Sequence, residues 1–250
     1  MLIPGLVSVS FRQKTPIEIV KLCNQAGLRA IEWGGDVHVP PKGGNAREVR
    51  QMTLDHGLTV SSYGSYYRVT QPMDDLLGCL DAAQELGTDV VRIWCGVKGS
   101  KDAEPKRGQI VDSLLSCCEQ AKKRNITLSL EYHGNTLTDA RESVIRLLQE
   151  TESVSDTLKF YWQPRFDWPT EECLLSLEDV RPRLNHLHVF TWLYDGKKAT
   201  RLPLEKGEAL WTKVFSSFTD DRFALMEFVE NDSDEALLRD AAVLNRWVRQ

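Results

Sequence analysis

The feature that most constrains the fold of this chain is a regular alternation of two kinds of segment along its length. Short runs rich in β-branched and aromatic residues are each followed by an amphipathic segment of ten or more residues. The first kind predicts strands at 6–11, 28–33, 58–63, 89–95, 126–132, 158–163, 184–190 and 222–228. The second kind predicts helices near 16–26, 45–56, 72–86, 104–124, 138–152, 169–180, 206–218 and 233–248. The sequence therefore predicts eight strand–helix units.

Residues that typically mark helix ends support this division. Proline stands at or near the start of three predicted helices, and glycine closes three, two of which are the same helices. These residues are Pro16, Pro72, Pro169, Gly27, Gly57 and Gly87. Because no Ser/Gly linker separates the units, we predict an α/β fold with a single (β/α)8 TIM barrel in one domain, residues 1–250. A doubly wound open sheet is the alternative, but the first strand is not followed by a glycine-rich phosphate loop.

Composition narrows the class of protein. Of the 250 residues, 42% are hydrophobic and 27% are charged, which is typical of a folded chain with a sizeable core. The formal net charge of -5 argues against a nucleic-acid partner, because phosphate binding needs clustered Lys and Arg. No apolar run approaches the roughly 20 residues that span a bilayer, and the N-terminus does not resemble a signal peptide. We therefore expect a cytoplasmic protein without a membrane partner that acts on a small carbohydrate-like molecule, and a homo-oligomer is possible.

The six cysteines are scattered, and none forms a CxxC pair or stands at zinc-finger spacing from a histidine. We interpret most of them as thiols that fill the core.

Polar side chains arrive at the carboxyl ends of four successive predicted strands, where the active site of a barrel lies. In 126–132 the alternation of apolar and polar residues turns Glu131 toward the barrel interior. Gln163 ends the sixth strand, His188 lies near the end of the seventh, and Glu227 occupies the matching position in the eighth. We expect Trp162, next to Gln163, to face the helices. The four polar side chains are therefore predicted to meet at one rim.

Two carboxylates, an imidazole and an amide oxygen are ligands that suit a divalent metal ion such as Mn2+, Co2+, Mg2+ or Zn2+. A cation at this position could stabilise an enediolate while Glu131 and Glu227 move a proton on either side of the substrate. Each residue alone also fits a structural role, because strand-terminal glutamates are often ion-paired and buried histidines often bond to the backbone. Their joint arrival at one rim favours a site.

Four segments in this order resemble the xylose isomerase-like TIM-barrel family of sugar and sugar-phosphate isomerases and epimerases: LSLEYHGNTLTD, LNHLHVFTW, RLPLEKGEALW and ALMEF. AIEWGGDVHVP and VVRIWCG resemble the second and fourth strands of that family. The resemblance implies a divalent metal held by Glu131, Gln163, His188 and Glu227, with the two glutamates also acting as acid and base. Gln163 stands where the family most often has aspartate. Since an amide carries no charge, we expect weaker metal binding or a changed metal preference.

Further residues are candidates for substrate binding. His133 and Arg201 resemble family positions near the substrate, although a loop hydrogen bond and a surface charge are the respective alternatives. His38, Trp33 and Trp94 are predicted to form walls of the substrate site, although such aromatics more often belong to the core. Glu32 fits a rim carboxylate and an internal ion-pair member equally well.

Three functions are compatible with this set. The favoured one is a metal-dependent isomerase or epimerase of a small sugar or hydroxy-keto compound, which moves a proton next to a carbonyl. The alternatives are a dehydratase or lyase of the same barrel, for example one acting on a keto-inositol, and a non-catalytic barrel that only binds a ligand. The DNA-repair endonucleases of this fold need a His-rich zinc cluster, which five histidines and an acidic chain disfavour.

Overall fold

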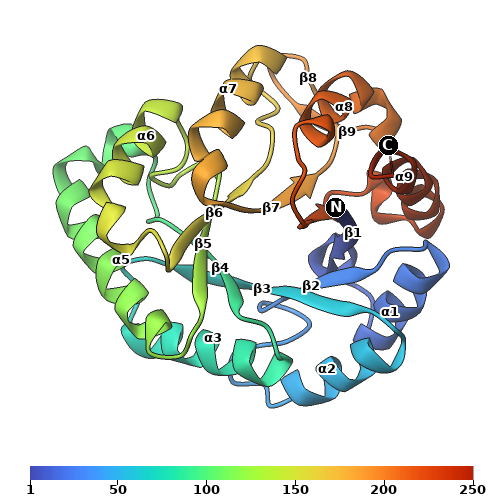
Figure 1. Cartoon of the computed structure of the whole chain (residues 1–250), viewed down its shortest axis with the longest axis horizontal. Helices are drawn as coiled ribbons and strands as arrows, with labels where there is room; N and C mark the ends of the chain where they lie inside the picture. Colours follow the sequence, from blue (N-terminus) through green and yellow to red (C-terminus); the bar gives the residue numbers. More distant parts are fainter. Residues whose placement is uncertain (250) are drawn as a thin grey trace.

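The computed structural model describes residues 1–249, and it contains a closed barrel of eight parallel strands with helices around it (Figure 1). The strands follow one another around the barrel in the order β1, β10, β7, β6, β5, β4, β3, β2. They are β1 (Leu2–Val7), β2 (Ala30–Gly34), β3 (Thr59–Arg68), β4 (Val90–Trp94), β5 (Thr127–Glu131), β6 (Leu158–Trp162), β7 (Leu184–Val189) and β10 (Arg222–Met226). The predicted (β/α)8 barrel is confirmed.

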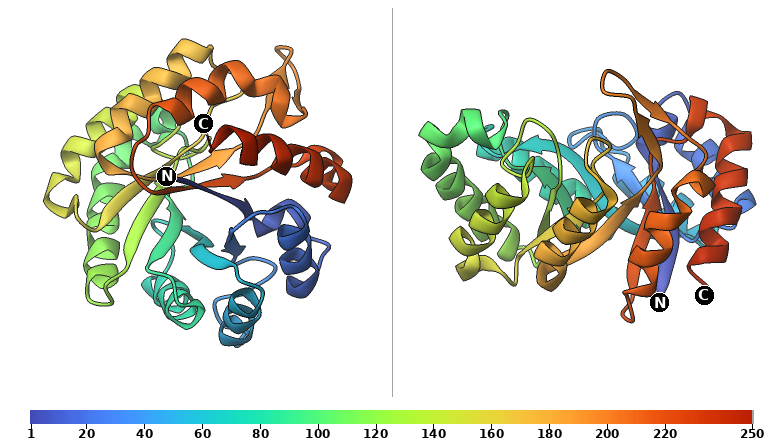
Figure 2. Two further views of the ribbon diagram at one scale, coloured as in Figure 1. Left: turned by 45° about the vertical axis from the view of Figure 1, so that its right-hand side comes forward. Right: turned by 90° about the horizontal axis from the view of Figure 1, so that it is seen from above.

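The helices form the outer layer in all views (Figures 1 and 2). They are α1 (Pro16–Gln25), α2 (Ala46–Asp55), α3 (Met73–Leu86), α4 (Ser100–Ala103), α5 (Arg107–Lys122), α6 (Arg141–Glu150), α7 (Thr170–Val180), α8 (Glu208–Ser216) and α9 (Asp234–Trp247). The predicted start of the first helix is confirmed: α1 begins at Pro16, and Thr15 and Glu18 form a capping box at its N-terminus. At the end of α3, Gly87 adopts φ +75°, a left-handed conformation that glycine reaches without strain.

The first strand lies four residues earlier than the sequence predicts. We expected a strand at 6–11, but β1 is Leu2–Val7 and residues Ser8–Phe11 form a 3-10 helix. Pro4 and Gly5 normally weaken a strand. Here Pro4 still accepts a hydrogen bond at 2.8 Å from the backbone nitrogen of Arg29, and Gly5 allows β1 to approach β2 and β10 closely. The close approach explains why a strand forms through a Pro-Gly pair.

Two features at the carboxyl end of the barrel were not predicted. Strand β3 continues to Arg68, five residues past its predicted end, and brings Tyr66 to the rim. A two-stranded antiparallel hairpin, β8 (Trp192–Tyr194) and β9 (Ala199–Arg201), follows β7 and projects from the end of the molecule away from the N-terminus (Figure 2). Strand β8 of this hairpin carries exposed Leu193 and Tyr194.

The main apolar core lies between strands and helices, whereas the barrel interior is largely polar apart from a small cluster of Val7, Ala30 and Leu225. Trp162 illustrates the outer layer: its side chain is fully buried and its indole N–H donates to Ser176 of α7 at 2.9 Å, as the strand alternation predicts. Ser129 illustrates the interior, because its hydroxyl accepts a hydrogen bond at 3.0 Å from the side-chain amide of Asn185 of β7. A polar barrel interior leads directly to the candidate site.

We predict that Gly5→Ala destabilises the protein. A Cβ at position 5 would lie 2.6 Å from the carbonyl oxygen of Ala30 and 2.7 Å from a Leu225 methyl, so the strands must separate. Overpacking of this kind costs about 1–3 kcal/mol, measured as the free energy of unfolding in urea. Gly108→Ala is the control, because a Cβ there meets no atom within 4 Å and α5 favours alanine. Equal stability of the two variants would contradict the close approach.

Candidate active site

A buried arginine lies at the centre of the polar barrel interior. Arg92 of β4 is 2% exposed, and its Nε donates to Glu32 Oε1 of β2 at 2.9 Å. Its Nη1 donates to Glu131 Oε2 of β5. Gly64 of β3 leaves room for this pair, because a Cβ there would lie 2.7 Å from Glu32 Oε1. Arg92 thus joins carboxylates from strands on both sides of β4.

The charges of this group stabilise one another. Burial by itself raises the pKa of Glu131, but Arg92 and His188 outweigh it and lower the pKa to about 2. Burial opposes the ionised form of Glu32 too, and the charge of Arg92 again keeps its pKa below the ordinary value. Both carboxylates are therefore ionised at neutral pH, although neither is exposed to bulk water.

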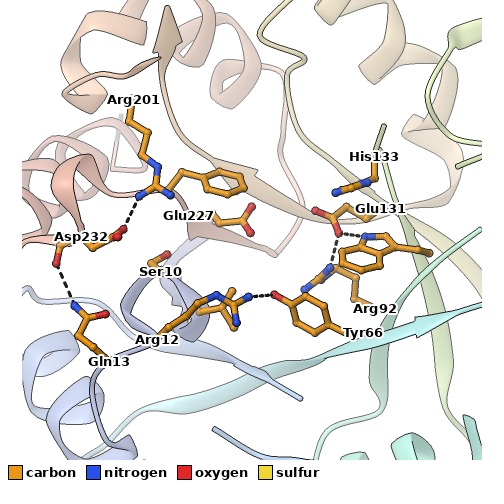
Figure 3. Close-up of a pocket in the computed structure, with 13 residues that line it drawn as sticks. Ser10, Arg12, Gln13, Tyr66, Arg92, Glu131, His133, Arg201, Glu227 and Asp232 are labelled. Atoms are coloured by element: carbon orange, nitrogen blue, oxygen red, sulfur yellow. Dashed lines mark hydrogen bonds and ion pairs between the residues drawn. The ribbon is translucent and has the colours of Figure 1, made fainter. Parts of the chain in front are cut away.

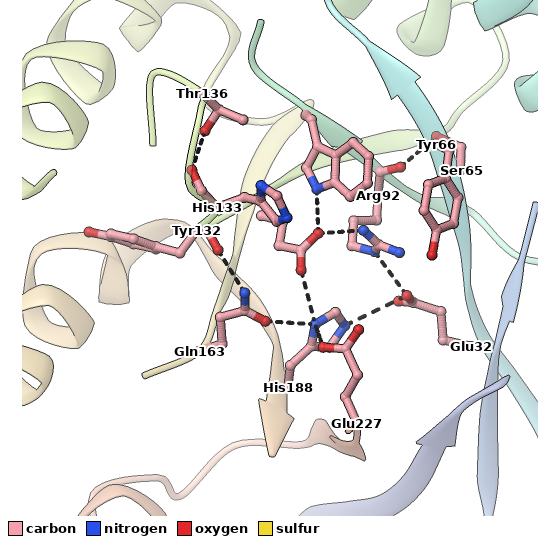
Figure 4. A network of polar contacts seen from close by, with 12 residues as sticks. Glu32, Ser65, Tyr66, Arg92, Tyr132, His133, Thr136, Gln163, His188 and Glu227 are labelled. Carbon is pink, nitrogen blue, oxygen red and sulfur yellow. Dashed lines mark hydrogen bonds and ion pairs between the residues drawn. The ribbon is translucent and has the colours of Figure 1, made fainter. Parts of the chain in front are cut away.

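The imidazole of His188 faces three acidic side chains (Figure 4). Its Nδ1 lies 3.5 Å from Glu131 Oε1 and 3.2 Å from Glu227 Oε2, and its Nε2 lies 3.6 Å from Glu32 Oε1. Burial lowers the pKa of His188, but the charge of Glu227 and the other carboxylates raises it well above the ordinary value. In this arrangement a protonated imidazole offsets part of the negative charge of the carboxylates.

Gln163 turns its carbonyl oxygen toward the same centre. Its amide nitrogen donates to the backbone oxygen of Tyr132 at 2.8 Å, and Oε1 then lies 3.1 Å from His188 Nδ1. Because the amide nitrogen donates to Tyr132 and the opposite oxygen faces His188, the orientation of the side chain follows from its hydrogen bonds.

The donor set fits a divalent metal ion. One ligand atom from each of Glu131, His188 and Glu227 lies within 4.8 Å of the other two, and Gln163 Oε1 points to the same Nδ1. Glu227 Oε2 is buried, and it faces His188 Nδ1 at 3.2 Å without forming a well-aligned hydrogen bond. A cation at this point would bind that oxygen directly, and its binding would release the proton of His188.

Above this centre lies a pocket of about 260 Å³ at the carboxyl end of the barrel (Figure 3). Glu131 and Glu227 line it, together with three arginines: Arg92, Arg12 and Arg201. Arg12 pairs with Asp36 and donates to the Tyr66 hydroxyl at 2.6 Å. The pocket is small, strongly polar and charged with both signs.

Three of the predicted substrate residues line this pocket. They are His133, Trp94 and Arg201. His133 Nδ1 lies 2.6 Å from the carbonyl oxygen of Gly134, so Nδ1 carries the hydrogen and a neutral ring has its lone pair on Nε2. Arg201 reaches the pocket from β9 and pairs with Asp232.

The other two predicted substrate residues lie elsewhere. Trp33 directly follows Glu32, whose side chain occupies the barrel interior, so Trp33 must face the helices. It is fully buried and donates to Thr53 of α2 at 3.1 Å. His38 is buried, with Nδ1 at 2.9 Å from Ser8 Oγ and Nε2 at 3.2 Å from the Lys14 carbonyl. Neither lines the pocket, and the prediction that they form its walls is wrong.

Several pocket residues were missed by the sequence analysis. Arg92 had a usable signal, because a charged residue at an inward position of the apolar run VVRIW requires a buried partner. Arg12 and Tyr66 had none, since they lie in segments whose structure was predicted differently. Glu32, left between two readings, is an internal ion-pair member.

Residues 20–247 match the family described as xylose isomerase-like TIM barrel. The chain belongs to this family. None of the helices described here is long and apolar enough to cross a membrane.

Among its relatives, the 3-dehydroshikimate dehydratase of Bacillus anthracis is 24% identical over 274 aligned residues, which cover 96% of this chain and 95% of the relative. A crystal structure of a probable 3-DHS dehydratase of the same organism has TM-score 0.79 and 22% identity, covering 98% of this chain and 99% of that one. A barrel protein of this family from Mycobacterium smegmatis, solved in complex with magnesium, has TM-score 0.70 and 14% identity, covering 95% and 90%. D-Psicose 3-epimerase of Clostridium cellulolyticum has TM-score 0.67 and 13% identity, covering 98% of each chain.

We predict that Arg92→Met is strongly destabilising, because it leaves Glu32 and Glu131 buried without their partner. Removing one partner of a buried ion pair lowers the free energy of unfolding by about 3–5 kcal/mol, and denaturant unfolding measures this loss. Arg146→Met is the control: Arg146 pairs with Glu104 and Glu150 on the surface, where such pairs contribute about 0–1 kcal/mol. A similar loss in both variants would show that Arg92 does not hold the interior together.

Proposed function

We propose that the protein is a divalent-metal-dependent dehydratase of a small cyclic hydroxy-keto acid such as 3-dehydroshikimate. The observation that carries the proposal is the convergence of Glu131 Oε1, Gln163 Oε1, His188 Nδ1 and Glu227 Oε2 beneath a pocket lined by arginines. The relationship to a dehydratase along nearly the full length of both chains supports this choice of reaction.

The four converging side chains would hold the metal. When bound, the cation would polarise the substrate carbonyl and stabilise the negative charge that develops on its oxygen. Oxygen and imidazole ligands suit Mg2+, Mn2+, Co2+ or Zn2+. The uncharged amide of Gln163 reduces the ligand charge relative to a carboxylate, and we expect the affinity to be lower for that reason.

Dehydration requires that a proton leave the carbon beside the carbonyl and that the hydroxyl on the next carbon leave as water. We assign proton removal to Glu227, because its carboxylate lines the pocket and its Oε1 is left for the substrate when Oε2 turns toward the metal. His133 lines the same pocket and, in its protonated form, would donate a proton to the departing hydroxyl. The electron pair of the broken C–H bond first enters the enolate; when the enolate collapses, that pair forms the new C=C bond, the C–O bond breaks and water leaves. Enolisation of the resulting dienone gives the aromatic ring.

The pocket suits a small anionic substrate. Its volume of about 260 Å³ holds a molecule of roughly one ring, and a polymer could not enter it. Arg12 and Arg201 stand at its edge, each with N–H groups beyond those used by Asp36 and Asp232. A substrate carboxylate would find charge-assisted hydrogen bonds there.

The isomerase or epimerase function favoured by the sequence shares the first step with dehydration. The structural likeness to D-psicose 3-epimerase reflects the fold, and the full-length relationship to a dehydratase makes dehydration the better-supported alternative. The two reactions differ in the fate of the enediolate, which is either reprotonated or expels a β-hydroxyl.

Incubation with 3-dehydroshikimate and Mg2+ or Mn2+ in D2O tests the proposal. We expect an aromatic dihydroxybenzoate by NMR and ultraviolet absorbance, no activity after treatment with EDTA, and recovery of activity when the metal is restored.

Glu227→Gln should lower turnover about 10²–10⁴-fold, because the base is lost. Glu230→Gln is the control, since Glu230 pairs with Arg239 outside the pocket. Solvent deuterium in unreacted keto compound without loss of water would favour an isomerase instead, and undiminished turnover without metal would contradict metal dependence.

Gln163→Asp should tighten metal binding, because it adds a negative charge to the ligand set. Calorimetric titration with Mn2+ measures the change, and Gln163→Asn is the matched control with the same shortened side chain and no charge. If the Asp and Asn variants bind Mn2+ equally, the side chain at position 163 lies outside the metal's ligands.

A further inference from the structure

One indole N–H in the pocket has an unusual partner. Trp94 donates to the ionised Glu131 Oε2 at 2.5 Å. Three other tryptophans, Trp33, Trp162 and Trp211, donate to neutral oxygens in the layer between strands and helices, and Trp247 donates to the Glu208 carboxylate only at the longer distance of 3.4 Å. A hydrogen bond to a charged acceptor is roughly twice as strong as one between neutral groups.

The ring of Trp94 is held on several sides. The guanidinium of Arg68 lies 4.3 Å from its centroid, and the rings of His133 and Tyr66 lie 4.8 Å and 5.0 Å away. The unpredicted extension of β3 supplies both Arg68 and Tyr66. With its faces and edge packed in this way, the indole has a fixed position, and its N–H is directed at a single acceptor.

The acceptor is one oxygen of the Glu131 carboxylate. Oε2 accepts from both Trp94 Nε1 and Arg92 Nη1, whereas Oε1 lies 3.5 Å from His188 Nδ1 at the centre of the ligand set. A rotation of the carboxylate about its own axis would break two charge-assisted hydrogen bonds. The two donors therefore determine which oxygen faces the metal.

We infer that Trp94 is a positioning residue that, with Arg92, holds Glu131 as a one-oxygen metal ligand and leaves proton transfer to Glu227. The inference rests on the proposed function. It differs from the pairing of two glutamates as acid and base that the family resemblance implies, because Oε2 of Glu131 is occupied by two hydrogen bonds and Oε1 faces the metal ligands, which leaves neither oxygen directed at the substrate.

The test compares Trp94→Phe with Trp162→Phe. Both replacements keep an aromatic ring and remove a single indole N–H, but only the first removes a donor to Glu131. Arg92 still satisfies Glu131 in the Trp94→Phe variant, so the fold should persist. By calorimetric titration with Mg2+ we expect about tenfold or more weaker binding in Trp94→Phe and wild-type affinity in Trp162→Phe.

A second measurement reports the hydrogen bond itself. In protein labelled with 15N-tryptophan, the indole signal missing from Trp94→Phe identifies Trp94, and Mg2+ should shift that signal while leaving the Trp162 signal in place. Unchanged Mg2+ affinity in Trp94→Phe, or an equal loss in both variants, would overturn the positioning role alone. A wild-type protein that binds neither Mg2+ nor Mn2+ would overturn the proposed function and this inference with it.

Discussion

The site depends on one charged group inside the barrel, the guanidinium of Arg92. When ionised, the three carboxylates around it, Glu32, Glu131 and Glu227, together with this one guanidinium leave a net charge of -2 in a space closed to bulk water. Such an excess is costly in a medium of low dielectric constant unless a positive charge balances it. A divalent cation would supply the missing charge, and in its absence a protonated His188 supplies half of it.

Much of the fold followed from periodicity, because strand and helix patterns are local and repeat eight times. The errors have local physical causes as well. β1 passes through Pro4 and Gly5, which weaken strands unless the neighbouring backbone lies close, and that closeness is a property of the barrel rather than of the segment. The hairpin β8–β9 consists of two three-residue strands, which are too short to produce a clear alternation.

The candidate site was partly predictable for a related reason. Glu131, Gln163, His188 and Glu227 could be found because each lies at or just after the end of a strand, and strand ends meet at one rim. Trp33 was misplaced although the alternation rule was available: a residue adjacent to an inward Glu32 faces outward. The bond between Trp94 and Glu131 could not be predicted, since it depends on the register of β4 against β5 and on the length of β3.

The hairpin has a consequence for how this chain could diverge. Arg201 reaches the pocket from β9, outside the barrel, whereas the ligand atoms beneath the pocket come from the barrel strands and the residues directly after them. Insertions or substitutions around exposed Leu193 and Tyr194 would leave the buried charges untouched. Selection can therefore alter which molecule is held at the pocket mouth while the buried side chains of the interior stay the same. The resulting proteins would carry out the same type of reaction and differ in substrate preference.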